Sequence, residues 1–245
     1  EVCEGEVCEG VVFAKAVGEY IAICEGDDYW TDEKKLQVQI DEMKKYPELG
    51  ISFHPSSVLK NNNIQNPALK NGNKVYAIQE IIRGDFHLVQ TNTIILKKEY
   101  LNNLSYTLLS KSPVGDVWIW IACSIPNGIL FLNKIMSVYR SQSEGSWSRS
   151  MEETEKFMVY VKRMMQSIDD FDKHWQYKYT KEFKFYKNRY INIITRKNIT
   201  KMQKNDFLKD YKDVISLKNK LLWNLLFKQQ NLFNFLKKIR KIWLK

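Results

Sequence analysis

The chain has 245 residues, of which 44% are hydrophobic and 27% charged, an ordinary composition for a globular protein large enough to bury a core. Its 38 lysines and arginines outnumber 28 aspartates and glutamates, a net charge of +10 that favours polyanionic partners: nucleic acids, anionic membranes or phosphorylated small molecules. Four cysteines without a C-x-x-C pair argue against a zinc site, and every apolar run is far shorter than the roughly 20 residues that span a bilayer.

The sequence opens on a five-residue repeat, Glu-Val-Cys-Glu-Gly, which occurs twice in the first ten residues. Such a repeat is too short to be a solenoid unit, so residues 1–13 are assigned to an irregular tail. A buried strand is predicted at 18–24, because a glycine opens a short apolar run there. The strand leads into an acidic turn, Glu-Gly-Asp-Asp-Tyr-Trp, at 25–30.

A helix is predicted from Thr31 to about Tyr46. Threonine is a residue type that caps helices, and the two acidic residues after it are favourably placed in a first turn. Leu36, Ile40 and Met43 then follow at helical spacing. The helix is expected to end near Tyr46, because the proline after it disfavours helical geometry in the preceding residue.

Short strands and helices alternate from residue 51 onwards. The expected strands are 51–53, 91–96, 129–132 and 135–139, the last two joined by an Asn-Lys turn, and the expected helices are 78–82, 97–101 and 117–124. Residues 60–74 are rich in asparagine and are expected to form a polar loop. This alternation argues for an α/β domain at 14–150.

Residues 151–245 are predicted to form a helical, basic extension. The segment 214–245 holds eight basic residues and no acidic ones, and its apolar residues fall largely on one helical stripe. One interpretation is an amphipathic helix that lies on an anionic membrane, which would suit a lipid-linked acceptor. The other is that the stripe packs against the preceding helices.

Asp27 and Asp28 are the first candidate site residues. A strand that ends in an acidic turn presents carboxylates at the edge of a sheet where open α/β folds bind ligands. Adjacent aspartates repel each other unless a cation or hydrogen bonds compensate them, and a hard divalent ion with phosphate co-ligands does this well. An isolated pair of this kind could equally cap the following helix in solvent.

The wider sequence around this pair, Gly-Glu-Tyr-Ile-Ala-Ile-Cys-Glu-Gly-Asp-Asp-Tyr-Trp at 18–30 followed by Lys-Leu-Gln at 35–37, resembles family 2 glycosyltransferases. In that family a "GeYIA" strand leads to a D-x-D-type motif, an aromatic pair and a "KLqkQ" helix. The resemblance implies that Glu25, Asp27 and Asp28 bind the diphosphate of a nucleotide-sugar donor. It also implies that Asp27 and Asp28 hold Mg²⁺ or Mn²⁺.

The second half of the domain is similar to the same family. Gly-Asp-Val-Trp at 115–118 resembles its "GD-x-x-l/w" segment, whose aspartate, here Asp116, is the implied general base. A carboxylate suits this role, although Asp116 alone could be a helix cap. Arg140 ends a segment like the family's "mavYR", and its planar fork could meet the donor phosphates or form a structural salt bridge. The family often has histidine where Gln142 stands here.

The resemblance covers roughly residues 14–150. It implies a GT-A-type sandwich that lacks its first βα units, with Trp30, Trp118 and Trp147 as candidate acceptor contacts. The implied function is inverting, metal-dependent sugar transfer from a nucleotide-diphosphate donor, expected to be UDP-linked, to a glycan or lipid-linked acceptor. The implied pathway is bacterial surface polysaccharide or glycolipid synthesis. The alternative is a non-catalytic remnant or partner subunit with an incomplete donor site.

The expected compartment is the cytoplasm, because the sequence shows neither a secretory signal nor a dense cysteine framework. A place on the inner face of the membrane would follow if the basic extension binds lipid. No motif of the usual nucleic-acid-binding kinds is present, so nucleic acid is not expected as a partner.

Overall fold

The computed structural model describes residues 13, 15–69, 72–84, 89–141, 151–196, 200–212 and 214–215. Most of the predicted tail and the basic segment from 216 onwards lie outside these residues. The chain divides into two compact units, 1–183 and 184–245. Within the described residues, no helix is long and apolar enough to cross a membrane.

A five-stranded mixed sheet forms the centre of the first unit. Its strands lie in the order β1 (Tyr20–Ala22), β7 (Ile95–Lys97), β3 (Ile51–Phe53), β8 (Ile129–Phe131) and β6 (Lys74–Tyr76). Only the β3–β8 pair is parallel, and the other neighbours run antiparallel. All residues of the central strands β3, β7 and β8 are buried, as expected for strands covered on both faces.

A second sheet of four strands has the order β2 (Tyr29–Trp30), β9 (Ser137–Arg140), β4 (Ser57–Lys60) and β5 (Asn63–Gln65). The hairpin β4–β5 occupies the start of the predicted polar loop, so that prediction was wrong for 60–65. Its two-residue turn, Asn61-Asn62, has φ values of 49° and 62°, which asparagine tolerates and type I′ hairpins require. The predicted Asn-Lys turn connects β8 of the five-stranded sheet to β9 of the four-stranded sheet, so these two strands do not pair with each other.

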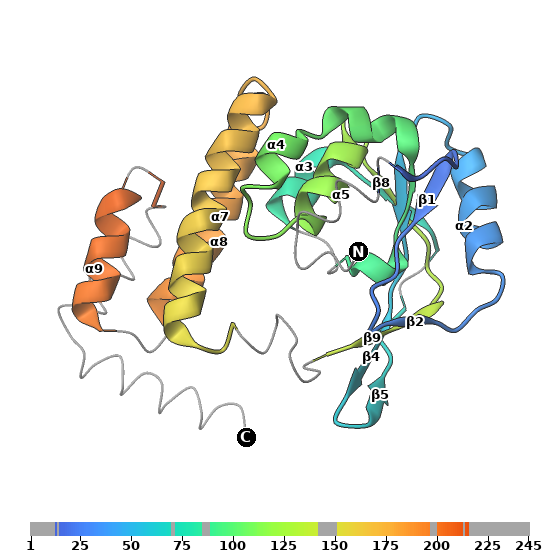
Figure 1. The fold of residues 1–245 in the computed structure, drawn as a ribbon, viewed down its shortest axis with the longest axis horizontal. Helices are drawn as coiled ribbons and strands as arrows, with labels where there is room; N and C mark the ends of the chain where they lie inside the picture. Colours follow the sequence, from blue (N-terminus) through green and yellow to red (C-terminus); the bar gives the residue numbers. More distant parts are fainter. Residues whose placement is uncertain are drawn as a thin grey trace. The chain divides into compact units, whose positions relative to one another are not determined.

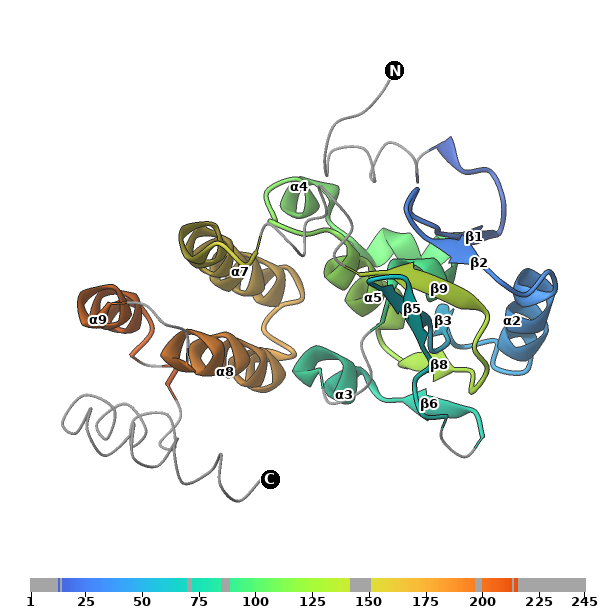
Figure 2. The ribbon, with the colours of Figure 1, turned by 90° about the horizontal axis from the view of Figure 1, so that it is seen from below.

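Helices cover both faces of the five-stranded sheet (Figures 1 and 2). On one side lies α2 (Lys35–Lys44), and on the other lie α5 (Asp116–Ser124) and α3 (Ile78–Arg83). The remaining short elements of this part are α4 (Tyr106–Leu109) and the 3₁₀ turns η1 (Thr91–Thr93) and η2 (Lys98–Asn103). The segment 91–96 therefore divides between η1 and β7, where the sequence predicted a continuous strand. The predicted mixed α/β class is confirmed.

Helix α2 differs from its prediction in its start and in its buried face. It begins at Lys35 and not next to Thr31, because the Asp32 carboxylate accepts a hydrogen bond from the Lys34 N–H (2.8 Å) and closes a turn first. Leu36 is 40% exposed, whereas Lys35, Gln39 and Met43 are buried. The inward face thus carries two polar residues that a hydrophobic pattern does not detect.

The first unit continues past residue 150, where the sequence placed the end of the α/β domain. Helix α7 (Thr154–His174) packs on α5 through Phe171, whose ring stacks on Trp118 at a centroid distance of 4.1 Å. Trp175 in turn stacks on Phe183 at 6.0 Å, in the first turn of α8 (Thr180–Arg196). These aromatic contacts join the helix that carries Asp116 to the helical part of the unit. The predicted helical extension is present in α7, α8 and α9 (Lys201–Asp210).

Candidate functional site

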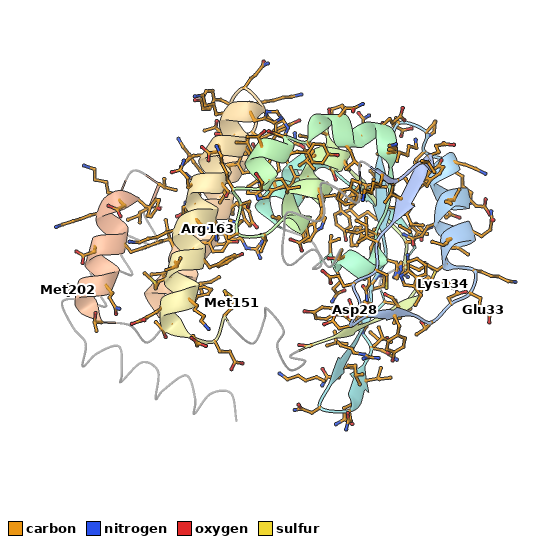
Figure 3. The ribbon with its side chains drawn as sticks, in the orientation of Figure 1. Asp28, Glu33, Lys134, Met151, Arg163 and Met202 are labelled. Atoms are coloured by element: carbon orange, nitrogen blue, oxygen red, sulfur yellow. The ribbon has the colours of Figure 1, made fainter. Side chains whose placement is uncertain are left out.

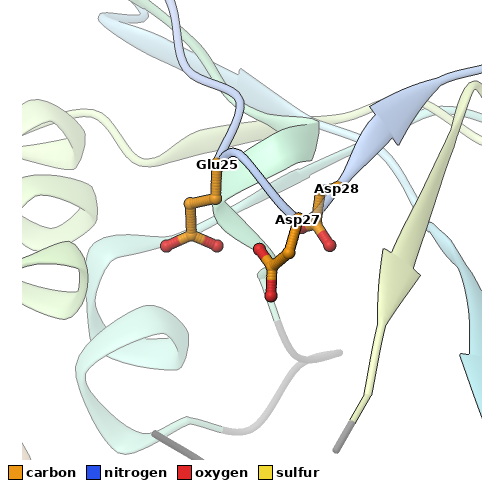
Figure 4. A group of neighbouring side chains, drawn as sticks. All are labelled: Glu25, Asp27 and Asp28. Carbon is orange, nitrogen blue, oxygen red and sulfur yellow. The ribbon is translucent and has the colours of Figure 1, made fainter. Parts of the chain in front are cut away.

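The acidic turn lies where the chain leaves one sheet and enters the other. It follows β1, is closed by a hydrogen bond from the Asp28 N–H to the Glu25 carbonyl (3.1 Å), and leads into β2, which pairs with β9. Carboxylate oxygens of Glu25, Asp27 and Asp28 lie within 4.8 Å of one another (Figure 4). The structure therefore brings together the three residues predicted to hold the donor and its metal ion.

Asp28 is the anchored member of the group. It is only 9% exposed, and Oδ1 accepts a hydrogen bond from the backbone N–H of Arg140 (2.8 Å). Oδ2 is buried and has no hydrogen-bond partner among the described residues. Burial and the neighbouring Asp27 raise the pKa of Asp28, while the hydrogen bond and charge of Arg140 lower it. A buried carboxylate oxygen without a partner is costly and favours a bound cation.

Glu25 is the most strongly perturbed acid of the site. The residue is exposed as a whole, and its carboxyl interacts electrostatically with Asp116, Asp28 and Asp27. Burial, and then the charges of these three residues, raise its pKa to about 7, against a hydrogen bond with Thr91 that lowers it. The repulsion shows that this region gathers negative charge with little compensation from the protein.

The donor set fits a hard divalent cation. All three side chains offer oxygen, the ligand type that Mg²⁺ and Mn²⁺ prefer, and one of the oxygens, Asp28 Oδ2, is buried without another partner in the described residues. A cation there would compensate the desolvation of that oxygen and offset the repulsion that contributes to the raised pKa of Glu25.

Asp116 stands at the first position of α5, where its Oδ1 accepts a hydrogen bond from the Val117 N–H (2.7 Å). It is half-buried and lines a cavity of about 260 Å³ together with Cys24 and Thr91. Its charge acts on Glu25, so the two predicted roles, donor binding and proton transfer, fall on neighbouring groups. The N-cap of α5 is Gly115, and no side chain caps the helix, so the alternative role of Asp116 as a helix cap is not seen in the structure.

Arg140 lies at the end of β9, next to the acidic turn. Its guanidinium is exposed and lies 5.3 Å from the ring centroid of Tyr29. Among the described residues its side chain forms no salt bridge within 4 Å, so the structural ion pair considered as an alternative is not seen there. The exposed guanidinium is available to an anionic ligand.

Two of the three predicted acceptor tryptophans can be placed, and one of them was a wrong prediction. Trp118 is fully buried, stacks on Phe171, and donates a hydrogen bond from Nε1 to Ser112 Oγ (2.7 Å), so an acceptor cannot reach it. Trp30 is half-buried, and its Nε1 donates to the Asn92 carbonyl (3.0 Å). Trp147, like Gln142, lies outside the described residues.

A buried polar cluster behind Trp30 was not predicted. Lys35 is 1% exposed, and its Nζ lies 4.4 Å from the Trp30 ring centroid without a hydrogen-bond partner in the described part of the chain. Burial lowers its pKa to about 8. His54 is fully buried, and burial lowers its pKa to about 3. Gln39 and Asn92 complete the cluster, each fully buried.

The cluster braces the segment that follows the acidic turn. The Gln39 amide donates to Ser52 Oγ (3.2 Å) and to the Thr93 carbonyl (3.0 Å), and the Asn92 amide donates to the Val138 carbonyl (3.0 Å). Farther along, Asp32 forms a salt bridge with Lys134 (2.6 Å). Lys134 is labelled in Figure 3. The only signal for this cluster in the sequence is the lysine and glutamine spacing of the "KLqkQ" resemblance.

Comparison with known proteins finds relatives in sequence. No family model matches the chain. Uncharacterised proteins of Mycobacterium tuberculosis and Mycobacterium bovis are 29% identical to it over 150 residues, which cover 60% of this chain and 41% of theirs. The chain thus spans about two-fifths of the length of these relatives.

Among solved structures, residues 1–349 of S. aureus TarS in complex with UDP-GlcNAc superpose with a TM-score of 0.56 at 15% identity, over 86% of this chain and 62% of that one. The same protein in complex with UDP gives 0.52 at 13% identity, over 86% and 61%. The chain therefore has a fold like that of TarS.

Proposed function

We propose that the chain belongs to a family 2 glycosyltransferase that moves a sugar from a nucleotide-diphosphate donor to an acceptor hydroxyl. The observation that carries the proposal is the group Glu25, Asp27 and Asp28, with carboxylate oxygens within 4.8 Å of one another, next to a fourth carboxylate, Asp116, on a glycosyltransferase-like fold. The similar TarS structures are complexes with UDP-GlcNAc and with UDP, which favours a UDP-linked donor.

In this proposal, Asp27 and Asp28 hold Mg²⁺ or Mn²⁺, and Glu25 lies beside them at the first position of the D-x-D-type motif. The ion, when bound, would offset the negative charge of the leaving diphosphate. Asp28 is the best-oriented ligand, because the Arg140 N–H fixes Oδ1 and leaves Oδ2 without a partner among the described residues. The exposed Arg140 guanidinium would bind phosphate oxygens from the side of β9.

Asp116 is the proposed general base. It would accept the proton of the acceptor hydroxyl as the hydroxyl oxygen attacks the anomeric carbon and the bond from that carbon to the diphosphate breaks. A direct displacement of this kind inverts the configuration at the anomeric carbon. The position of Asp116 at the start of α5 suits the role, because the helix is held from behind by the Trp118–Phe171 stack.

The acceptor class in the proposal is a glycan or lipid-linked sugar in surface polysaccharide or glycolipid synthesis, reached from the cytoplasmic face of the membrane. The basic segment 214–245 would then hold the enzyme on anionic lipid.

Calorimetric titration with UDP and Mn²⁺ tests the donor half of the proposal. The wild-type chain should bind UDP only when Mn²⁺ is present. Asp28→Ala should weaken Mn²⁺ binding by on the order of 100-fold, since it removes a direct ligand, where loss of even an outer partner typically costs 10–100-fold. Asp41→Asn, which neutralises an exposed carboxylate on α2, serves as the control and should bind like wild type.

Two results would contradict this proposal. Binding that survives equally in Asp28→Ala and Asp41→Asn would remove the metal role from the acidic turn. No binding of Mn²⁺ or UDP by the wild-type chain would favour the alternative of a non-catalytic partner subunit.

A further inference from the structure

The 3₁₀ turn η1 holds both ends of the acidic turn. The Thr91 side chain has a hydrogen bond with Glu25, the first acidic residue. The Asn92 carbonyl accepts a hydrogen bond from Trp30 Nε1 (3.0 Å), at the end of the turn. Two consecutive residues of η1 thus contact the segment 25–30 where it begins and where it ends.

Asn92 also binds β9 through its side chain. Its Nδ2 donates a hydrogen bond to the Val138 carbonyl (3.0 Å), and because a carbonyl can only accept, this contact fixes the orientation of the amide. Val138 stands opposite Tyr29 in the β2–β9 pair. Farther along β9, the Arg140 N–H donates to Asp28 Oδ1 (2.8 Å). The backbone and the side chain of Asn92 therefore join the same two strands that set the orientation of the Asp28 carboxylate.

The strand pair that carries Asp28 is short. β2 has only two residues and pairs with β9 through both of them, whereas strands usually have about three to ten residues. One further backbone hydrogen bond follows, from the Thr31 N–H to the Met136 carbonyl (3.0 Å). Within the described residues β2 is also an edge strand, with β9 as its one neighbour. Contacts from outside the pair are therefore important for its geometry.

The turn η1 is itself firmly held. Thr91, Asn92 and Thr93 are 8%, 0% and 0% exposed. Thr93 closes the turn, because its N–H (2.9 Å) and its Oγ1 (2.6 Å) both donate to the Gln90 carbonyl. Strand β7 follows, with all three residues buried, between β1 and β3 of the five-stranded sheet. Asn92 thus connects the acidic turn to the core of the first unit.

We infer that Asn92 is a positioning residue for the cation site of the acidic turn: it holds β9 against β2, so that the Arg140 N–H keeps Asp28 Oδ1 and leaves Oδ2 for the cation. The inference rests on the proposed function for the identity of the site as a metal site. It extends that function by naming a residue that is not a ligand, since the carbonyl and the amide of Asn92 bind Trp30 and Val138.

Amide hydrogen exchange in the Asn92→Ala variant tests the positioning without any ligand. Loss of the bond to Val138 should let β9 separate from β2 more often, so the Arg140 N–H should exchange about fivefold faster, the equivalent of one hydrogen bond. The Leu132 N–H, which donates to the Phe53 carbonyl in the first unit (2.9 Å), should exchange as in wild type. Equal acceleration of both amides would show a general destabilisation and overturn the inference.

Titration with Mn²⁺ tests the consequence for the site. Asn92→Ala should weaken Mn²⁺ binding by about tenfold, the lower end of the range for residues that orient a metal ligand. Trp30→Phe removes the Nε1 donor, keeps an aromatic ring, and should weaken binding in the same direction. Asn103→Ala is the matched control and should bind Mn²⁺ like wild type, since the Asn103 amide donates to the carbonyls of Ala122 and Ile125 (3.3 Å each).

The two measurements keep this inference apart from the proposed function. A wild-type chain that binds no Mn²⁺ would overturn the proposed function and the metal role of Asn92, while a selective change in Arg140 N–H exchange would still place Asn92 behind Asp28. If the wild type binds Mn²⁺ and Asn92→Ala binds it equally well, the inference is wrong. Weakening of the same size in Asn103→Ala would also overturn it.

Discussion

The acidic turn and the buried cluster behind Trp30 both contain polar atoms that lack partners among the described residues, but they differ in charge and in access to solvent. The turn gathers the carboxylates of Glu25, Asp27 and Asp28, and a ligand can reach them. The cluster encloses the cation of Lys35, and its side chains are almost completely buried. A bound cation can therefore compensate the carboxylates of the turn, whereas the polar atoms of the cluster are enclosed by the fold and no ligand reaches them.

The two regions adjoin each other through β2, since Asp28 precedes Tyr29 and Trp30, and Lys35 lies against the Trp30 ring. We therefore interpret the cluster as the support on which the acidic turn is held. The following predictions test that division, because Mn²⁺ should change the pH dependence of stability that arises in the turn and leave that of the cluster unchanged.

The largest expected effect comes from His54. Its pKa is lowered from 6.5 to about 3 by burial, so the unfolded chain takes up a proton that the folded protein excludes, and stability falls as the pH drops from 6.5 to 3. By linkage this contribution is roughly 4 kcal/mol. Urea unfolding across this range should show a shallower loss for His54→Asn than for wild type, and Mn²⁺ should not alter the difference. Parallel curves for the two proteins would show that His54 is not the group responsible.

Lys35 should produce the next largest effect, which has the same sign as that of His54 but appears at alkaline pH. Burial lowers its pKa from 10.5 to about 8, so the folded protein loses the proton first, and stability rises between pH 8 and 10.5 by roughly 3 kcal/mol. Lys35→Met keeps the length of the side chain and should lack this rise. The difference in unfolding free energy between the two proteins isolates the contribution of Lys35 from that of the tyrosines that titrate in the same range. A rise that persists in Lys35→Met would contradict the prediction.

Glu25 should give the smallest effect on stability and the one that a metal removes. Its pKa is raised from 4.5 to about 7, so its contribution to stability is present below pH 4.5 and is lost as the pH rises through 7. Because the residue is exposed, solvent screening limits the loss to about 1 kcal/mol. Thermal unfolding should show this loss in wild type and not in Glu25→Gln.

Saturating Mn²⁺ provides the decisive control for the comparison. It should cancel the loss of stability that Glu25 causes at higher pH, since a cation favours the ionised carboxyl. It should leave unchanged the differences in stability between wild type and the His54→Asn and Lys35→Met variants. If Mn²⁺ shifts all three alike, the turn and the cluster are one coupled electrostatic system and the division proposed here is wrong.

Much of the site could be predicted from the sequence, because its candidate ligands are close together in the chain. The strand that ends at Ala22, the acidic residues 25–28 and the helix that begins at Asp116 were all predicted at or within a few residues of their observed places. An apolar run, a turn and a short helix are local features, and a local pattern of residue types is enough to specify them.

Tertiary structure decided which of these residues can meet a ligand. Trp118 was predicted to contact the acceptor, yet Phe171, more than fifty residues away in the chain, covers its ring. The Arg140 N–H that fixes Asp28 comes from a strand 112 residues later. Burial and partnership are properties of contacts between distant segments, so no local pattern records them.

The sequence by itself thus determined the class of fold, the acidic turn and the identity of the candidate base. Only the fold decided that Lys35 and Gln39 face inward, that the predicted loop at 60–65 closes into a hairpin, and that an apolar cavity lies beside Asp116. The physical reason is that the free energy of a polar or aromatic side chain depends on the atoms that surround it, and those atoms are set by packing across the whole unit.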